Sequence, residues 1–204
     1  ARENSRSQQL NRRVRFLVKD LNTVTLPKQR YSCVVAHDVL HHVLNLDHLL
    51  DEVKKTLKPG GLFLVMDYSG MGKIRKLFAA ALFAILPTYQ PYKEKWHLRK
   101  RLSSFLASEK EKRTALTLGK SKALHPESPF EEISQSSILP AIRHRFHVER
   151  IVTSYPFWFY LAPKIRTPRR FRSSFARSMK ALDDALISLN PSLGAYISLE
   201  ARKT

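Results

Sequence analysis

Apolar and polar positions follow regular patterns over the first seventy residues. Val14, Phe16 and Val18 occupy every second position, which predicts a short strand that ends at Asp20. Residues 31–36 and 62–66 are continuous apolar runs, typical of strands buried on both faces. Between the two runs, five apolar residues recur at helical spacing and predict an amphipathic helix: Leu46, Leu49, Leu50, Val53 and Leu57.

The remaining segments predict more helix than strand. Residues 1–11 are polar and predict a helix, and residues 71–113 predict two helices with a break at Pro87 and Pro91. The later elements are, in order, a helix over 129–142, a strand from Phe146 to Val152, an aromatic and proline-rich loop over 155–168, a helix over 169–189 and a final strand from Leu193 to Ala201.

The order strand, helix, strand near the start of the chain predicts a parallel sheet covered by helices, and hence an α/β fold. With 204 residues, of which 43% are hydrophobic, the sequence is long enough for one domain with a substantial core. The single cysteine, Cys33, excludes a disulfide framework within this chain.

Charge is distributed unevenly. The formal net charge is +19, and a basic excess of this size favours an anionic partner such as a nucleic acid, a membrane surface or an acidic substrate. Residues 31–70 nevertheless contain more acidic than basic residues, whereas residues 71–125 contain 13 basic and 3 acidic ones.

The apolar run from Leu77 to Leu86 has ten residues, fewer than the roughly 20 that span a bilayer. No secretory leader is recognised, so we expect a cytoplasmic location.

Four blocks within residues 13–67 resemble the class I S-adenosylmethionine-dependent methyltransferases, most closely the group that includes enzymes of ubiquinone and menaquinone biosynthesis. The blocks are Val18-Lys19-Asp20-Leu21-Asn22, Leu26-Pro27, residues 31–43 (Tyr-Ser-Cys-Val-Val-Ala-His-Asp-Val-Leu-His-His-Val) and residues 57–64 (Leu-Lys-Pro-Gly-Gly-Leu-Phe-Leu). Each block alone is weak, but their order and spacing together are fairly specific.

The resemblance implies a Rossmann-like sheet with helices on both faces, a helical insertion after the fifth strand of the family, and S-adenosyl-L-methionine as cofactor. It implies that Asp20 binds the adenine amino group and that the backbone of Leu21 meets the adenine ring. It also places His37 beside the methionine part of the cofactor and adds His42 to the cofactor site. Ligands of open parallel sheets do lie at the carboxyl ends of the strands.

The sequence departs from the family at two places. The family's first strand is followed by a glycine-rich turn and its second strand ends in an acidic residue, and neither feature is recognised here. The six glycines all follow the blocks that carry Asp20 and His37: Gly60, Gly61, Gly70, Gly72, Gly119 and Gly194. We therefore expect a truncated methyltransferase in which the first two strands are absent, and expect this chain alone to be inactive.

On this interpretation the chain has three parts: residues 1–70 in the cofactor-binding core, 71–142 as a helical insertion or lid, and 143–204 as the last two strands and a helix. The candidate catalytic residues are His37 and Asp38, because each can act as a general base near neutral pH. Packing against the cofactor is the alternative role of His37, since alignment alone drives many methyl transfers.

Four aromatic residues of the insertion and the later loop are candidates to line an acceptor pocket: Tyr89, Tyr92, Trp96 and Trp158. The alternative is that these side chains simply pack in the core. His37, His41 and His42 have helical spacing, but no carboxylate or cysteine completes a convincing ligand set, so no metal is predicted.

The leading hypothesis is methyl transfer from S-adenosylmethionine to a small-molecule acceptor. The alternative is a non-catalytic basic module that binds RNA or an anionic membrane surface on a degenerate methyltransferase fold. Of these partners, the sequence favours a small-molecule acceptor, allows a membrane surface next to the basic helices, and favours nucleic acid less.

Overall fold

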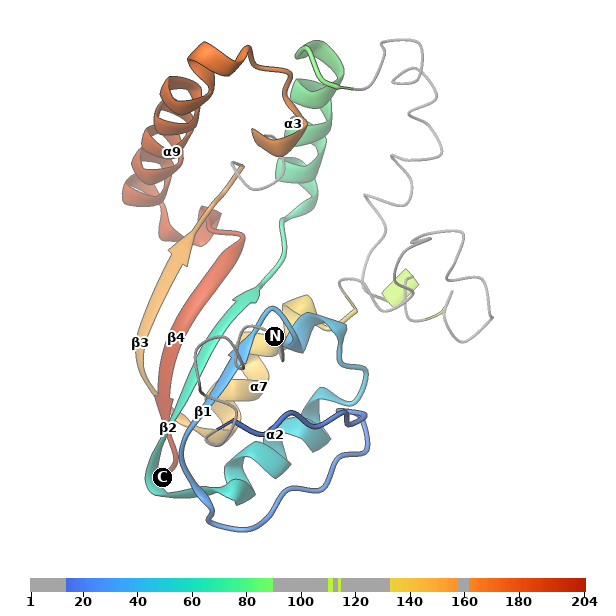
Figure 1. The fold of residues 1–204 in the computed structure, drawn as a ribbon, viewed down its shortest axis with the longest axis vertical. Helices are drawn as coiled ribbons and strands as arrows, with labels where there is room; N and C mark the ends of the chain where they lie inside the picture. The colour runs from blue at the N-terminus through green and yellow to red at the C-terminus, as the bar shows by residue number, and fades with distance from the viewer. Residues whose placement is uncertain (1–13, 90–109, 112–113, 115–132, 158–161) are drawn as a thin grey trace.

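Four strands form one mixed sheet. A computed structural model describes residues 14–89, 110, 111, 114, 133–157 and 162–204 (Figure 1). The strands are β1 (Tyr31–His37), β2 (Leu57–Tyr68), β3 (His147–Ser154) and β4 (Tyr196–Arg202), in the spatial order β1-β2-β4-β3. β1 and β2 are parallel, whereas β4 runs antiparallel to both β2 and β3. The apolar runs over 31–36 and 62–66 are thus neighbouring strands, as the sequence predicted.

The helices divide between the sheet and a region beyond it. Helices α2 (Leu46–Thr56) and α7 (Ile138–Arg145) pack on one face of the sheet, while α3 (Lys73–Ile85) and α9 (Arg172–Leu189) lie beyond the carboxyl ends of β1 and β2 (Figure 1). Five short 3-10 turns connect these elements: Leu40–His42, Gln135–Ser137, Ala162–Lys164, Arg169–Phe171 and Pro191–Leu193. No helix of the described part has the length and apolar character needed to cross a membrane.

The core lies between the sheet and the pair α2 and α7. Because strand residues alternate between faces, every second side chain of β2 and β4 points toward these helices. The buried residues of this core include Leu49, Leu50, Val53, Phe63, Val65, Ile138, Ile142, Ile197, Leu199 and Ala201. Arg145 joins the two helices, because its guanidinium lies 2.6 Å from Asp51 and 2.9 Å from Asp47.

The opposite face of the sheet is largely open to solvent in the middle of the described strands, whereas Tyr68 and Tyr196 at one end of it are buried. Val35 is 65% exposed, and Met66 and Val152, which lie on the same face, are each 45% exposed. The expectation of helices on both faces is therefore met on the α2 and α7 side and stays a prediction on the other.

One predicted strand does not form. Residues 14–20 have no regular structure, and all seven are exposed, Val18 to 92%. The alternating pattern at Val14, Phe16 and Val18 correctly reports β-forming residues, but a strand needs a neighbour to receive its backbone hydrogen bonds. No described strand lies beside these residues, because the sheet ends at β1.

The other elements agree with the pattern, with shifts at their ends. The predicted helix over 129–142 begins at Ile138 in the described part, after a turn over Gln135–Ser137. The final strand begins at Tyr196, because the Asn190 side chain accepts a hydrogen bond from the Ser192 N–H and stabilises a turn there. The predicted elements over 1–11, 92–109 and 115–128 lie outside the described residues.

Gly194 marks the point where the chain enters β4. A Cβ at this position would lie 2.4 Å from the Thr153 Cβ and 2.9 Å from the Ser154 nitrogen, whereas a Cβ at Gly72 would contact nothing within 4 Å. We predict that Gly194→Ala lowers the free energy of unfolding by about 1–3 kcal/mol through overpacking against β3. Gly72→Ala is the control without overpacking and should lower it by about 0.5–1 kcal/mol, because alanine is less favourable than glycine at the N-cap of α3. Urea denaturation of both variants measures the difference, and equal effects would contradict this close packing.

Candidate functional site at the carboxyl ends of β1 and β2

A buried carboxylate lies at the end of β2. The side chain of Asp67 has no solvent exposure, because it points to the same side of the sheet as Phe63 and Val65. Its Oδ2 accepts hydrogen bonds from the backbone N–H of Val39 (3.0 Å) and of Leu40 (2.7 Å). Its Oδ1 accepts from its neighbour Tyr68 N–H (2.7 Å) and lies 2.5 Å from His41 Nδ1. Four donors therefore surround this one carboxylate.

These donors determine the ionisation of Asp67. Burial by itself raises the pKa of the carboxyl group, but the hydrogen bond from His41, the charge of that imidazole and the backbone N–H groups of Leu40 and Val39 outweigh it. The pKa of Asp67 consequently lies below its ordinary value, and the group is ionised at neutral pH. Because a carboxylate only accepts hydrogen bonds, the proton between the two side chains is assigned to His41 Nδ1.

His41 connects three segments. The residue is 6% exposed. The centroid of its ring lies 3.9 Å from that of the His42 ring and 6.1 Å from that of the Tyr68 ring, which it meets edge-on. Its carbonyl oxygen accepts hydrogen bonds from the N–H groups of Ile133 (2.9 Å) and Ser134 (3.3 Å). The end of β2, the turn after β1 and the segment before α7 are thereby held together through one residue.

His37 and Asp38 occupy the end of β1, at the surface. Their side chains are 59% and 41% exposed, and His37 Nδ1 lies 3.4 Å from Asp38 Oδ2. The Asp38 backbone N–H donates to the Met66 carbonyl at 2.9 Å, so the chain stays attached to β2 up to this residue. Asp38 then has φ of +48°, an uncommon conformation for a residue other than glycine that often occurs at functional sites.

Hydrogen bonds of Asn22 attach the turn that carries Asp20 and Leu21 to the loop before α2. The Asp20 carboxylate accepts hydrogen bonds from the Asn22 N–H (2.9 Å) and the Asn22 side chain (3.0 Å), and the backbone bond contributes most to lowering the pKa of Asp20. Asn22 in turn accepts from the N–H groups of Leu44 and Asn45, at 2.9 and 3.0 Å. The turn that carries exposed Asp20 is thus tied to the loop that follows His41 and His42.

The comparisons with known proteins concern the sequence and the fold. Residues 1–65 match the family described as "Methyltransferase domain". Sixty residues are 35% identical to a hybrid PKS-NRPS synthetase of Neonectria sp. (strain DH2), and 61 residues are 36% identical to highly reducing polyketide synthase 40 of Fusarium mangiferae. These matches cover 29% and 30% of this chain and 2% of each relative, so the chain spans a small part of the curated relatives it matches.

Among solved structures, a geranyl diphosphate methyltransferase in complex with SAM is similar over 99% of this chain and 62% of that chain, with 13% sequence identity and a TM-score of 0.50. At this identity the likeness concerns the fold. The chain shares the fold of that methyltransferase, and its residues 1–65 match the methyltransferase-domain family.

The predicted residues of this methyltransferase fold separate into two groups. Asp20, Leu21, His37, Asp38 and His42 all lie on the turns around the ends of β1 and β2, whereas Tyr89 lies past the far end of α3. Thirteen helical residues separate Tyr89 from this end of the sheet, about 20 Å at 1.5 Å per residue. Tyr92, Trp96 and Trp158, the other predicted acceptor residues, lie outside the described residues.

The sequence-based prediction missed Asp67 as a site residue. The resemblance selected Asp20, whereas none of the four blocks includes Asp67, although Asp67 also ends an apolar strand run. Apart from the adjacent Tyr68 N–H, the hydrogen-bond partners of Asp67 are distant in the sequence, with His41 26 residues away, so the pattern does not reveal its role. Within the described residues, no three His, Cys, Asp or Glu side chains form a group that could hold a metal ion.

Asp67 gives a test of this arrangement. We predict that Asp67→Asn lowers the free energy of unfolding by about 2–4 kcal/mol, because an amide nitrogen would face a hydrogen-bond donor on one side of the pocket. Asp184→Asn, which removes an exposed carboxylate paired with Lys180 at 2.5 Å, should cost about 0.5 kcal/mol or less. Chemical denaturation at neutral pH measures both, and similar losses would contradict the buried network.

The pH dependence of the same variant provides the control. In the folded protein, the pKa of Asp67 lies below the ordinary value of 3.8. The ionised carboxylate therefore stabilises the folded state fully above pH 3.8, and this contribution is lost as the pH falls further. The stability difference between the wild type and Asp67→Asn should therefore shrink below pH 3.8.

Proposed function

We propose that the strand-end site takes part in methyl transfer from S-adenosylmethionine to a small-molecule acceptor. The observation that carries this proposal is the position of the methyltransferase-like sequence: residues from its blocks converge on the carboxyl ends of two parallel strands, where ligands of open α/β sheets bind. The solved methyltransferase of similar fold supports it, since its description names SAM as a bound ligand.

The described residues fit one end of this cofactor. The exposed carboxylate of Asp20 has acceptor capacity beyond its hydrogen bonds to Asn22 and Thr23, so it would accept from the adenine amino group. Leu21 is half-buried against the core and would offer an apolar contact to the adenine ring. When bound, S-adenosylmethionine supplies an electrophilic methyl group on a sulfonium.

His37 is the proposed base. When an oxygen or nitrogen acceptor takes up a methyl group, its proton must leave, and the exposed imidazole of His37 would receive that proton. The Asp38 carboxylate at 3.4 Å would stabilise the imidazolium that results. Asp67 and His41 act as positioning residues, because their contacts hold the turn on which His37 and Asp38 lie.

The sequence contains no Gly-x-Gly-x-Gly turn, and in methyltransferases of this class such a turn approaches the cofactor. We therefore propose that this chain by itself binds the cofactor weakly and transfers methyl groups poorly.

Calorimetric titration with S-adenosylhomocysteine tests the cofactor site. We expect tight binding to the chain extended by about 80 residues encoded upstream, enough for a further strand–helix–strand unit and its connection, and weak binding to the chain alone. In the extended protein, Asp20→Asn should weaken binding about tenfold through loss of a charged acceptor. Asp184→Asn, a carboxylate on α9, is the matched control. Absence of binding from both folded proteins would overturn the proposed function.

His37→Gln tests the chemical step. With an acceptor found by screening for transfer of a radiolabelled methyl group, we expect kcat to fall about 100-fold, because a general base is removed. The affinity for S-adenosylhomocysteine should stay within about twofold if His37 acts on the acceptor. His147→Gln, which changes an exposed histidine at the start of β3, should leave both values unchanged. An equal loss in the two variants would rule out a specific role for His37.

A further inference from the structure

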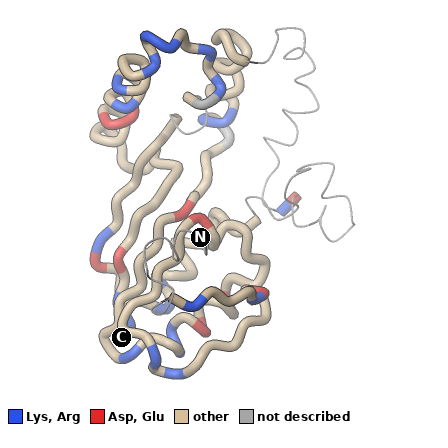
Figure 2. The backbone as a smooth tube through the Cα atoms, viewed as in Figure 1, with Lys and Arg blue, Asp and Glu red and all other residues tan. Residues whose placement is uncertain are grey.

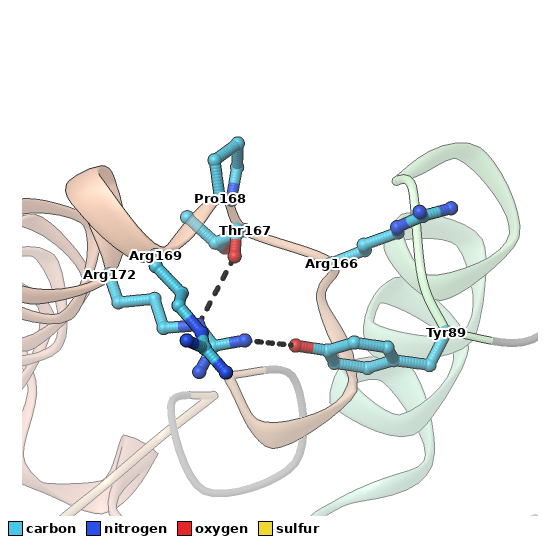
Figure 3. Close-up of a pocket in the computed structure, with 6 residues that line it drawn as sticks. All are labelled: Tyr89, Arg166, Thr167, Pro168, Arg169 and Arg172. Carbon is cyan, nitrogen blue, oxygen red and sulfur yellow. Dashed lines mark hydrogen bonds between the residues drawn. The ribbon is translucent and has the colours of Figure 1, made fainter.

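A second candidate site lies beyond the far end of α3. An open pocket of about 420 Å³ is lined by Tyr89, Arg166, Thr167, Pro168, Arg169 and Arg172 (Figure 3). Backbone hydrogen bonds hold its two walls together: Arg166 N–H donates to the Pro87 carbonyl at 2.8 Å, and Tyr89 N–H donates to the Lys164 carbonyl at 3.3 Å. The pocket is therefore formed by paired backbone segments.

Two arginine side chains line the same side of this pocket. Figure 3 shows the side chains of Arg169 and Arg172 pointing toward the hydroxyl end of Tyr89, whereas the Arg166 side chain points away from them. Arg172 Nη2 donates to Tyr89 Oη at 3.2 Å, and Arg172 Nε donates to the Thr167 carbonyl at 3.3 Å. These bonds fix the orientation of Arg172 and leave further N–H donors of its planar fork for a ligand.

The positive charge of this pocket has no acidic counterpart in the described part of the chain. None of the ion pairs found there includes Arg166, Arg169 or Arg172. The two carboxylates of α9 have other partners: Asp184 pairs with Lys180, and Asp183 accepts the Phe157 N–H at 3.3 Å. An anion bound beside these arginines would therefore gain a favourable charge interaction that no described carboxylate supplies.

The chemistry of the pocket selects a class of ligand. Arginine forks bind the oxygens of phosphate in a bidentate manner. A phosphate monoester carries a charge of about −1.5 to −2 near neutral pH. The pocket also lies at the start of the 18-residue helix α9, whose dipole adds partial positive charge there. Figure 2 shows Lys and Arg concentrated on α9 and the segment before it; residues 162–190 hold seven basic and two acidic residues.

We propose that Tyr89, Arg169 and Arg172 form a binding site for a phosphate group, with Arg166 at its rim. The phosphate could belong to a soluble phosphate or diphosphate ester or to a lipid headgroup, and both sources present the same oxygens to the arginines. The proposal does not rest on methyl transfer, because its readout is anion binding.

Two probes distinguish the sources. Calorimetry with inorganic pyrophosphate reports a soluble phosphate ligand, and co-sedimentation with phosphatidylcholine vesicles, with and without phosphatidic acid, reports a lipid headgroup. The variants are Arg169→Gln, in the turn before α9, and Arg172→Gln, at the start of α9. The matched control is Arg177→Gln, which removes the same charge from an exposed position on α9 outside the pocket. Circular dichroism shows whether each variant folds.

We expect the wild type to bind at least one probe, and each pocket variant to bind it about tenfold or more weakly, with Arg177→Gln within about twofold of wild type. Arg172→Lys keeps the charge but not the planar fork, so it should also weaken binding. This variant tests the position if Arg172→Gln does not fold. Failure of the wild type to bind either probe would overturn the proposal. An equal loss in the Arg177 variant would also overturn it, because general basic charge would then explain the binding.

Discussion

Asp67 brings a negative charge to a position that solvent does not reach, and the turn after β1 is folded around that charge. Removing a carboxylate from water costs several kcal/mol unless donors in the protein replace the lost hydration. Here the replacements come from the backbone at Val39 and Leu40 and from His41, which are adjacent in sequence. The conformation of this turn is therefore determined by the need to satisfy one buried group.

The exposed pair at the end of β1 follows from the same constraint. Asp38 continues the pairing with β2 through its N–H, yet the next two N–H groups turn to Asp67. The backbone changes direction at Asp38, and its positive φ is the cost of that change. His37 and Asp38 are consequently held at the surface by interactions that lie beneath them, which is the usual relation between a reactive group and its support.

The local patterns in the sequence predicted the described strands of the sheet and the helices α2, α3 and α9, because burial on one face leaves a period that can be counted. They were wrong at Val14, Phe16 and Val18, where the period is present but no strand lies alongside to pair with it. They did not predict the contact of Asp67 with His41 or that of Tyr89 with Arg172. The two residues of the first contact are 26 positions apart in the sequence, and those of the second are 83 positions apart. The resemblance placed Asp20 and His37 in one site, and the fold connects the turn of Asp20 to the loop after His42 through Asn22, without a strand at residues 14–20.

The strand-end site and the arginine pocket are separated by the length of α3, about 20 Å. Charges that face solvent interact weakly beyond the Debye length, which is about 10 Å at 0.1 M salt. Asp38 and Asp67 therefore do not neutralise Arg169 and Arg172, and the arginines do not stabilise an anion at the ends of β1 and β2. A compact ligand would contact one of the two places only. Affinity in each must arise from its own residues, so the pocket can bind phosphate whether or not the strand-end site is occupied.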